Sequence, residues 1–171
     1  MFRVVVLLVL AMAGTSSFAL DCSWTRPLGD MGPPGAAVLG NSFSSAGTYT
    51  DCYTFDLSGS AASFGGALEI NTLLNSLEID INSVALYSPG GTQIGYDDSP
   101  LAFSFGALAG GLGYTLAVVS EVASNWGLYD GKVGYVGGFA TYASPAPEPA
   151  PAAMLLIGML GVWMASRRRR R

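Results

Sequence analysis

The sequence predicts an all-β protein, an antiparallel β-sandwich followed by a C-terminal transmembrane helix. Short segments with turn signals between them recur roughly every ten residues from position 48 onward, as in β-sandwiches. No alternation of strands with long helical patterns is visible, which argues against a parallel βαβ fold. The helix is predicted from an uncharged run, residues 152–165, that precedes a cluster of terminal arginines.

The N-terminus has the features of a secretory signal peptide, assigned to residues 1–19. Arg3 supplies a basic start, and Val4 to Ala13 form an apolar run. Ser17 and Ala19 are small residues at the two positions that a signal peptidase reads, so we expect cleavage after Ala19. An uncleaved anchor is the alternative, and the short apolar run argues against it.

Residues 20–47 are predicted to be an irregular lead-in. They are rich in Gly, Pro, Ser and Ala and show no clear period, apart from one edge strand expected around residues 37–43. Cys22 lies in this segment and Cys52 in the strand that follows. In an oxidising compartment we expect a disulfide between them, contributing ~3 kcal/mol through the closed loop. Free thiols or an intermolecular bridge are the alternatives.

Residues 48–143 are assigned to the sandwich, and their first strand gives the clearest pattern. Residues that are expected to face the core alternate there with threonines and other polar residues. This period of two predicts a half-buried strand. The alternating set is Tyr49, Asp51, Tyr53, Phe55 and Leu57. The other predicted strands cover 63–70, 77–81, 84–87, 93–96, 101–105, 114–120 and 132–142. Ser88 to Gly91 predicts a hairpin turn.

One segment of the sandwich is ambiguous. Its leucines could instead form one face of an amphipathic helix, so a helical alternative stays open there. The leucines concerned are Leu68, Leu73, Leu74 and Leu77.

Residues 144–171 form a tail with three zones. Prolines alternate with other residues up to Pro151 and predict an extended spacer. The uncharged run 152–165 would make a helix of about 21 Å, which is short for a membrane span. Basic residues that stay cytoplasmic follow it: Arg167, Arg168, Arg169, Arg170 and Arg171. A buried core helix with a nucleic-acid-binding tail is the alternative, and the absence of a polar stripe argues against it.

The tail resembles the PEP-CTERM sorting signal. Pro147, Glu148 and Pro149, a short apolar helix and an arginine cluster follow one another in that family's order. The resemblance implies recognition by an exosortase, a membrane-embedded cysteine transpeptidase that cuts near Pro-Glu-Pro. It also implies a Gram-negative source, a transient stay in the inner membrane after signal peptidase cleavage, and delivery to the cell surface or to an exopolysaccharide matrix.

The sandwich carries a second resemblance. Tyr49, Asp51 and Tyr53 are similar to the aromatic-x-Asp-x-aromatic signature of the FxDxF subgroup, with tyrosines for phenylalanines and an unusual Cys52 inside the motif. Residues 105–118 resemble that subgroup's late hairpin. The same arrangement is similar to bacterial pre-peptidase C-terminal domains, which implies a jelly-roll-like sandwich and no catalytic activity.

Composition excludes several kinds of function. Residues 20–144 hold two basic and eleven acidic residues, a net charge of −9, which argues against nucleic-acid binding. The chain has no histidine, so histidine-dependent catalysis and histidine metal sites are excluded. A carboxylate pair, either Asp97 with Asp98 or Glu78 with Asp80, would be needed for glycoside hydrolysis. We interpret these acidic residues instead as solvent-exposed side chains, and we expect that the protein is not an enzyme.

Two binding functions remain as alternatives. Asp97 and Asp98 lie at a turn and offer oxygen ligands to Ca²⁺, with Asp51 and Asp130 as further candidates, although we expect no cofactor. Asp51 is alternatively expected to fix a strand start or a bulge through its hydrogen bonds. Trp126, with Asn125 and Tyr129 in one loop, offers a carbohydrate platform or a lid over the core. The expected function is that of a non-enzymatic, exported surface or matrix protein.

Overall fold

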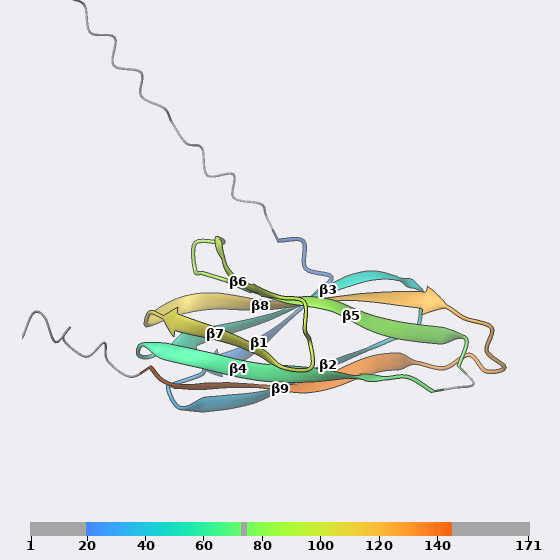
Figure 1. The fold of residues 1–171 in the computed structure, drawn as a ribbon. Helices are drawn as coiled ribbons and strands as arrows, with labels where there is room; N and C mark the ends of the chain where they lie inside the picture. The colour runs from blue at the N-terminus through green and yellow to red at the C-terminus, as the bar shows by residue number, and fades with distance from the viewer. Residues whose placement is uncertain (1–19, 73–74, 145–171) are drawn as a thin grey trace, which may run out of the picture.

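In this computed structural model, residues 20–72 and 75–144 are described, and they contain nine strands (Figure 1). The strands are β1 (Trp24–Asp30), β2 (Gly35–Phe43), β3 (Gly47–Leu57), β4 (Ala61–Ile70), β5 (Leu77–Tyr87), β6 (Gln93–Asp97), β7 (Phe103–Leu108), β8 (Gly111–Ser124) and β9 (Val133–Ala143). The part of the chain that the structure describes has no helix long and apolar enough to cross a membrane. The predicted transmembrane helix falls outside it.

The strands form two sheets that lie face to face as two layers (Figure 1). The five-stranded sheet has the order β1-β3-β8-β5-β6, and the four-stranded sheet has the order β2-β9-β4-β7. From β2 to β9 the chain crosses repeatedly between the sheets, and every pairing among these strands is antiparallel. Such interleaving of two antiparallel sheets is the arrangement of a jelly roll. The predicted all-β sandwich is confirmed.

The core lies between the two sheets and draws side chains from both. Alternate residues of each strand point inward, because successive side chains of a strand face opposite sides of its sheet. Aromatic rings dominate the centre: Phe55 stacks on Tyr114 at 5.5 Å and lies 5.1 Å from Phe139 between ring centroids. The predicted alternation in β3 is confirmed, since Tyr53, Phe55 and Leu57 are buried in this core.

The lead-in assigned to residues 20–47 is not irregular, and that prediction is wrong. The expected edge strand is confirmed as β2, which lies at one edge of the four-stranded sheet. The additional strand β1 was not predicted. It pairs in parallel with β3, with Trp24 opposite Asp51. The sandwich therefore begins at Trp24 rather than at position 48.

The helical alternative for the ambiguous leucines is also wrong. Leu68 lies in β4 and is exposed, whereas Leu77 opens β5 and packs against the core. The two residues thus belong to different strands. Leu73 and Leu74 lie outside the described residues.

One predicted hairpin is confirmed and another is wrong. β5 and β6 pair antiparallel around a turn in which the Gly91 amide donates to the Ser88 carbonyl at 2.8 Å. The segment 105–118 is no hairpin, because β7 belongs to the four-stranded sheet and β8 to the five-stranded sheet. The short connection between them, at Ala109 and Gly110, carries the chain from one layer to the other.

Candidate functional site

The residues of the predicted sorting signal lie outside the described residues. These are Pro147, Glu148 and Pro149, the apolar run and the five arginines, and the predicted signal peptide 1–19 is outside as well. The described chain ends at Ser144, one residue beyond β9. Its amide donates to the carbonyl of Ser60 at 3.4 Å. The tail therefore leaves the domain at the end of a strand that is paired on both sides.

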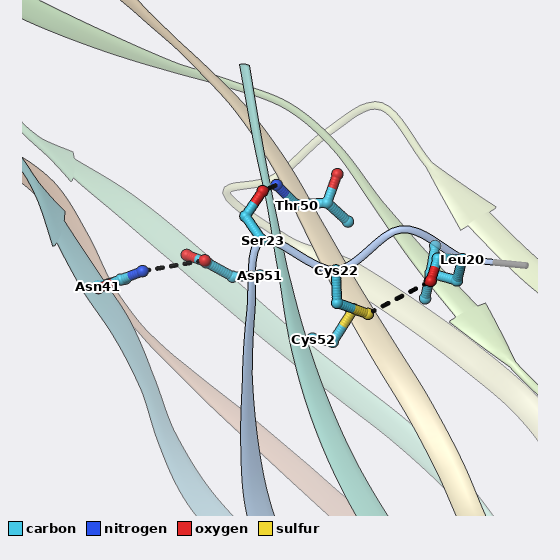
Figure 2. Close-up of a disulfide and its surroundings, with 7 residues drawn as sticks. All are labelled: Leu20, Cys22, Ser23, Asn41, Thr50, Asp51 and Cys52. Atoms are coloured by element: carbon cyan, nitrogen blue, oxygen red, sulfur yellow. Dashed lines mark hydrogen bonds between the residues drawn. A yellow bond between two sulfur atoms is a disulfide. The ribbon is translucent and has the colours of Figure 1, made fainter. Parts of the chain in front are cut away.

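The predicted disulfide between Cys22 and Cys52 is confirmed (Figure 2). Its Cα atoms lie 5.8 Å apart, and it closes a loop with a sequence separation of 30. Backbone contacts reinforce it, since the Ser23 amide donates to the Thr50 carbonyl and the Thr50 amide donates to Ser23 Oγ. The bond fastens the beginning of β1 to the middle of β3, on the side of β3 that faces away from the core.

Asp51, the acidic residue of the aromatic-x-Asp-x-aromatic pattern, is a core residue. It lies in the middle of β3 with 1% of its surface exposed, so it neither starts a strand nor makes a bulge. Asn41 Nδ2, on β2 of the opposite sheet, donates to Asp51 Oδ1 at 2.9 Å (Figure 2). The hydroxyl of Tyr135, on β9, donates to Asp51 Oδ2 at 2.7 Å. Both carboxylate oxygens are thus bound by the other layer.

Tyr53, the second aromatic residue of the motif, extends this network. Its hydroxyl lies 2.8 Å from that of Tyr135, and it accepts the Gly40 amide hydrogen at 2.8 Å. Tyr135 has one hydroxyl hydrogen and gives it to Asp51, so Tyr53 must be the donor between the two tyrosines. The hydrogen bonds therefore run in one direction, from Gly40 through Tyr53 and Tyr135 to the carboxylate of Asp51. They cross between the layers at each step.

The first aromatic residue of the motif, Tyr49, sits at the rim of the core. Its ring lies 4.4 Å from that of Phe43, between centroids, and its hydroxyl donates to the Ser45 carbonyl. The three alternate residues of the motif thus make different contacts. Asp51 and Tyr53 contact β2 and β9, and Tyr49 contacts β2 and the loop that follows it. Asp51 and Tyr53 connect the two layers from inside the core, whereas the Tyr49 hydroxyl makes its hydrogen bond at the exposed rim.

Burial controls the ionisation of this cluster. Loss of hydration raises the pKa of Asp51 above its usual 3.8, although hydrogen bonds from Tyr135 and Asn41 act in the opposite direction. Burial also raises the pKa of Tyr53 and of Tyr135, so both phenols stay protonated and remain donors. A carboxyl group with two protein donors and no solvent contact is suited to holding the layers together.

The structure does not bring the calcium candidates together. Asp97 Oδ1 accepts the Ser99 amide hydrogen at 2.8 Å in a local turn, and Asp98 is exposed. Asp51 lies three strands away across the five-stranded sheet, roughly 14 Å at ~4.8 Å per strand. Asp130 instead accepts from Ser76 Oγ at 2.9 Å. Within residues 20–72 and 75–144, no cluster of three or more potential metal-binding acids or cysteines occurs.

Glu78 and Asp80 are exposed on the outer side of β5, as expected for solvated acids. With Glu69 and Glu121 they line an open hollow of about 260 Å³. Asp80 lies directly opposite Glu121 across the strand pair, where two like charges repel each other. A glycosidase general acid depends on burial in apolar surroundings, and these carboxyl groups lack it.

Trp126 is fully exposed, so the expectation that it covers the core is wrong. Its loop is nevertheless well anchored. Asn125 Oδ1 accepts the Trp126 amide hydrogen at 2.8 Å. Tyr129 is 66% exposed and its backbone bridges to Asn75. The loop thus presents two free aromatic rings on a fixed backbone.

Sequence reasoning missed three asparagines that organise the structure. Asn75 is buried and ties the loop to β5, accepting the Gly131 amide hydrogen at 2.9 Å and donating to the Lys132 carbonyl at 3.3 Å. Asn71 pairs with both backbone groups of Ile79 in the manner of a strand neighbour. Asn41 binds Asp51. Asn71 and Asn75 lie just outside strand ends, where asparagine is common and no period distinguishes a buried side chain. Asn41 lies within β2 between the buried Leu39 and Phe43, so the period of two in that strand is the signal that places it on the core side.

Comparisons with known proteins are sparse. No protein-family model matches the chain, and a search of curated proteins found no match. Among solved structures, the chain is similar to PliG from Aeromonas hydrophila, a periplasmic lysozyme inhibitor of g-type lysozyme. The two share 16% identity with a TM-score of 0.38, over 68% of this chain and 98% of that one.

Proposed function

We propose that this protein is a non-enzymatic envelope or extracellular-matrix protein that an exosortase sorts through its C-terminal signal. The order of the tail carries the proposal: Pro147-Glu148-Pro149, an uncharged run and a terminal arginine cluster follow one another. The disulfide supports export, because such bonds persist mainly in oxidising compartments outside the cytoplasm. The N-terminal signal pattern supports the same route.

The proposed mechanism is a transfer between two membrane-associated enzymes. Signal peptidase cuts after Ala19, and the apolar run 152–165 with its arginines holds the chain in the inner membrane. The proline-rich spacer keeps the sandwich away from the bilayer and presents Pro147-Glu148-Pro149 for cleavage. The domain then passes to the cell surface or into the exopolysaccharide.

The inward-facing motif agrees with a structural role for the domain. The polar groups of Asp51 and Tyr53 are hydrogen-bonded to the opposite layer. This supports interpreting the motif as a determinant of the fold rather than as a ligand site. An acidic, disulfide-linked sandwich would stay soluble and resist unfolding outside the cell. The fold resembling pre-peptidase C-terminal domains is part of this proposal.

Two variants test the sorting proposal in a Gram-negative host that encodes an exosortase. Deletion of residues 147–171 should remove both membrane retention and processing. Replacement of Pro147, Glu148 and Pro149 by alanine should keep retention but block cleavage, so that the uncut chain accumulates in the inner membrane. Cell fractionation with immunoblotting reads out both. Unchanged fractionation of the deletion variant would refute the proposal.

The second candidate function is carbohydrate binding in the matrix, and the fully exposed Trp126 favours it. Indole and phenol rings stack on the apolar faces of sugars, and Tyr129 lies in the same loop. Glycan-array binding that Trp126→Ala removes, and that Tyr96→Ala leaves unchanged, would support it. Tyr96 is a matched control because it is 59% exposed but lies on β6. Absence of binding to any matrix polysaccharide would refute it.

A further inference from the structure

The strand β1 is fastened to the rest of the domain at two points, one at each end. At its beginning, the disulfide between Cys22 and Cys52 ties it to β3 (Figure 2). At its end, the amide of Met31 donates to the Asp56 carbonyl at 2.9 Å, and the carbonyl of Met31 accepts the hydroxyl of Thr141. Met31 is also buried in the core. The disulfide therefore restrains one end of β1, and other contacts restrain the opposite end.

The pairing of β1 with β3 is interrupted between these two points. The register shifts between Pro27 and Gly29, so Leu28 has no counterpart on β3. Pro27 has no N–H to donate, and Gly29 has a φ of 79°, a conformation that glycine adopts at little cost. The two parts of β1 can therefore separate from β3 independently, with a hinge at Leu28. We call the first part, Trp24–Pro27, the latch segment.

The latch segment is held weakly apart from the disulfide. Each of its residues is exposed. It lies at the edge of the five-stranded sheet, so it pairs with β3 and with no second strand among those described. The residue of β1 that packs against the core cluster is Leu28, at the hinge. Exposed backbone that is paired on one side opens at a small cost in free energy, and here the bond between Cys22 and Cys52 prevents it.

The latch segment covers one side of the buried hydrogen-bond network. Trp24 lies opposite Asp51 and Arg26 opposite Tyr53, so the side chains of β1 at these positions are on the core side of the sheet. The Trp24 ring meets the Tyr53 ring edge-on, with 5.8 Å between the ring centroids. At this edge of the sheet, β1 is the strand between β3 and solvent. Opening of the latch segment would therefore give water access to Tyr53 and Asp51, which are both buried when it is closed.

We propose that the disulfide is a redox latch on this network. In the reduced domain, the latch segment moves away from β3 at the hinge and uncovers Tyr53 and Asp51. In the oxidised domain, it closes over them. Thiols stay reduced in the cytoplasm, where an exported chain is made, so the latch closes only after export. This inference rests on the export that is part of the proposed function, and it needs neither exosortase cleavage nor carbohydrate binding.

Closing the latch is a thiol–disulfide exchange. One cysteine thiolate attacks a more oxidising disulfide of a dithiol–disulfide oxidant and forms a mixed disulfide, and the second cysteine thiolate then attacks that bond. The domain gives up two electrons and two protons, and the oxidant leaves as a dithiol. Cys52 lies in the middle of β3, which is paired with β8 along its length. Cys22, next to the latch segment, is therefore the partner that moves.

Hydrogen exchange on residues 20–144 tests the proposal, since all nine described strands, the core and the disulfide lie in this piece. The reporters are the amides of Ser23 and Thr50, which donate to the Thr50 carbonyl and to Ser23 Oγ. Both should exchange at least about tenfold faster in the double variant Cys22→Ser with Cys52→Ser, and in the reduced parent, than in the oxidised parent. The Met31 amide, beyond the hinge, should change by less than about threefold once the change in global stability, read from amides of β8, is taken into account.

Tryptophan fluorescence gives a second measurement. Trp126→Phe leaves Trp24 as the sole tryptophan of residues 20–144. Reduction should make the fluorescence of Trp24 more accessible to acrylamide, and reoxidation should reverse the change. Trp24→Phe is the matched control. It leaves Trp126, which is fully exposed in a loop at the end of β8, and its quenching should be the same in both redox states.

Coupling to the network distinguishes a latch from a general loss of stability. Tyr135→Phe removes the hydrogen bond to Asp51. Water can replace this bond once the latch segment is open, so the substitution should change the unfolding equilibrium constant at least about fivefold less in the reduced domain than in the oxidised domain. Tyr142→Phe, exposed on the same strand, should have the same effect in both redox states.

Three results would overturn the latch. The amides of Ser23 and Thr50 would exchange equally in both redox states, or the Met31 amide would be released together with them, or the effects of reduction and of Tyr135→Phe would be additive. Failure of the proposed export gives a different result. The full chain would then stay in the cytoplasm with free thiols, detected by alkylation, while the purified domain would still show the redox-dependent exchange.

Discussion

The Tyr135 hydroxyl donates to the buried carboxylate of Asp51 over 2.7 Å, although the two residues are 84 positions apart in the chain. Tyr135 lies on β9 and Asp51 on β3, so the bond joins the last described strand to the third and one layer to the other. It forms only when both sheets are complete and in register.

The ionisation of Asp51 makes stability depend on pH. Because burial raises its pKa in the folded protein, the folded state holds the proton more tightly than the unfolded chain, where the group titrates near 3.8. Its contribution to the free energy of unfolding is therefore complete below pH 3.8 and is lost as the pH rises through the folded-state pKa. Asp51→Asn removes this dependence. Urea unfolding of both proteins from pH 3 to 8 should show the wild type losing stability relative to the variant as the pH rises. A constant difference would contradict this.

Removing the acceptor altogether should have a larger effect. In Asp51→Ala, Asn41 Nδ2 and the Tyr135 hydroxyl both lose their partner inside the core. Each unsatisfied group costs about 1 to 3 kcal/mol, so we expect a loss of several kcal/mol in the free energy of unfolding at pH 7. Asp98→Ala is the control, with an effect within about 0.5 kcal/mol because Asp98 is exposed. Similar effects for the two variants would show that the network is not stabilising.

The direction of the hydrogen bonds predicts the effect of one missing oxygen atom. In Tyr135→Phe, Asp51 loses a donor and the Tyr53 hydroxyl loses its acceptor. We expect a loss of about 2 to 4 kcal/mol, measured by denaturant unfolding. Tyr142→Phe lies on the same strand but is exposed, and it should change stability by less than about 0.5 kcal/mol. Equal effects at both positions would refute the assigned role.

The disulfide should stabilise the domain and hold one strand in place. Replacing Cys22 and Cys52 by alanine opens a loop with a sequence separation of 30, which should cost about 3 to 4 kcal/mol in the chain-entropy model. Because β1 pairs with β3 alone, its amides should exchange hydrogen faster in the variant. Amides of β8, which is central in the same sheet, serve as the internal reference. Unchanged exchange in β1 would mean that its pairing is sufficient without the bond.

Calcium should leave the domain unaffected. Asp97 and Asp98 lie at a turn where Asp97 already binds the Ser99 amide, and the described chain supplies no third acid nearby. We therefore expect the melting temperature to stay within about 1 °C in millimolar Ca²⁺, measured by calorimetry on residues 20–144. Magnesium at equal ionic strength is the control. A rise of several degrees with Ca²⁺ alone would revive calcium binding as a function.

The sequence identified strands best where one side of the strand faces water. In β3, Tyr53 and Phe55 alternate with polar residues, and the strand was predicted almost to its ends. In β4 both sides of the strand are apolar, because Phe64 and Leu68 lie on the side that is exposed to solvent. The alternation of apolar and polar residues is therefore absent, and the sequence leaves a helix as an alternative to the strand. β1 was missed for another reason. It is largely exposed and contains Pro27 and Gly29, and it is a strand because a disulfide and a parallel pairing hold it beside β3.

The residues of the candidate site likewise differ in how well the sequence predicts them. Cys22 and Cys52 pair as predicted, because a chain with two cysteines has a single possible intramolecular pairing. The position of Asp51 could not be predicted, since an acidic residue in an alternating strand normally marks the solvated side, and only its distant partners Asn41 and Tyr135 make burial tolerable. The sorting signal is defined by sequence order alone, and Pro147 and the arginines remain predictions.

The exit of the tail from β9 has a mechanical consequence. β9 is paired along its length with β2 on one side and β4 on the other, so a pull on Ser144 along the strand strains both ladders at once. Force in this direction shears the ladders instead of opening them pair by pair from one end. Tension applied at the C-terminal end of the described domain would therefore be carried by a strand that is hydrogen-bonded to a neighbour on both sides.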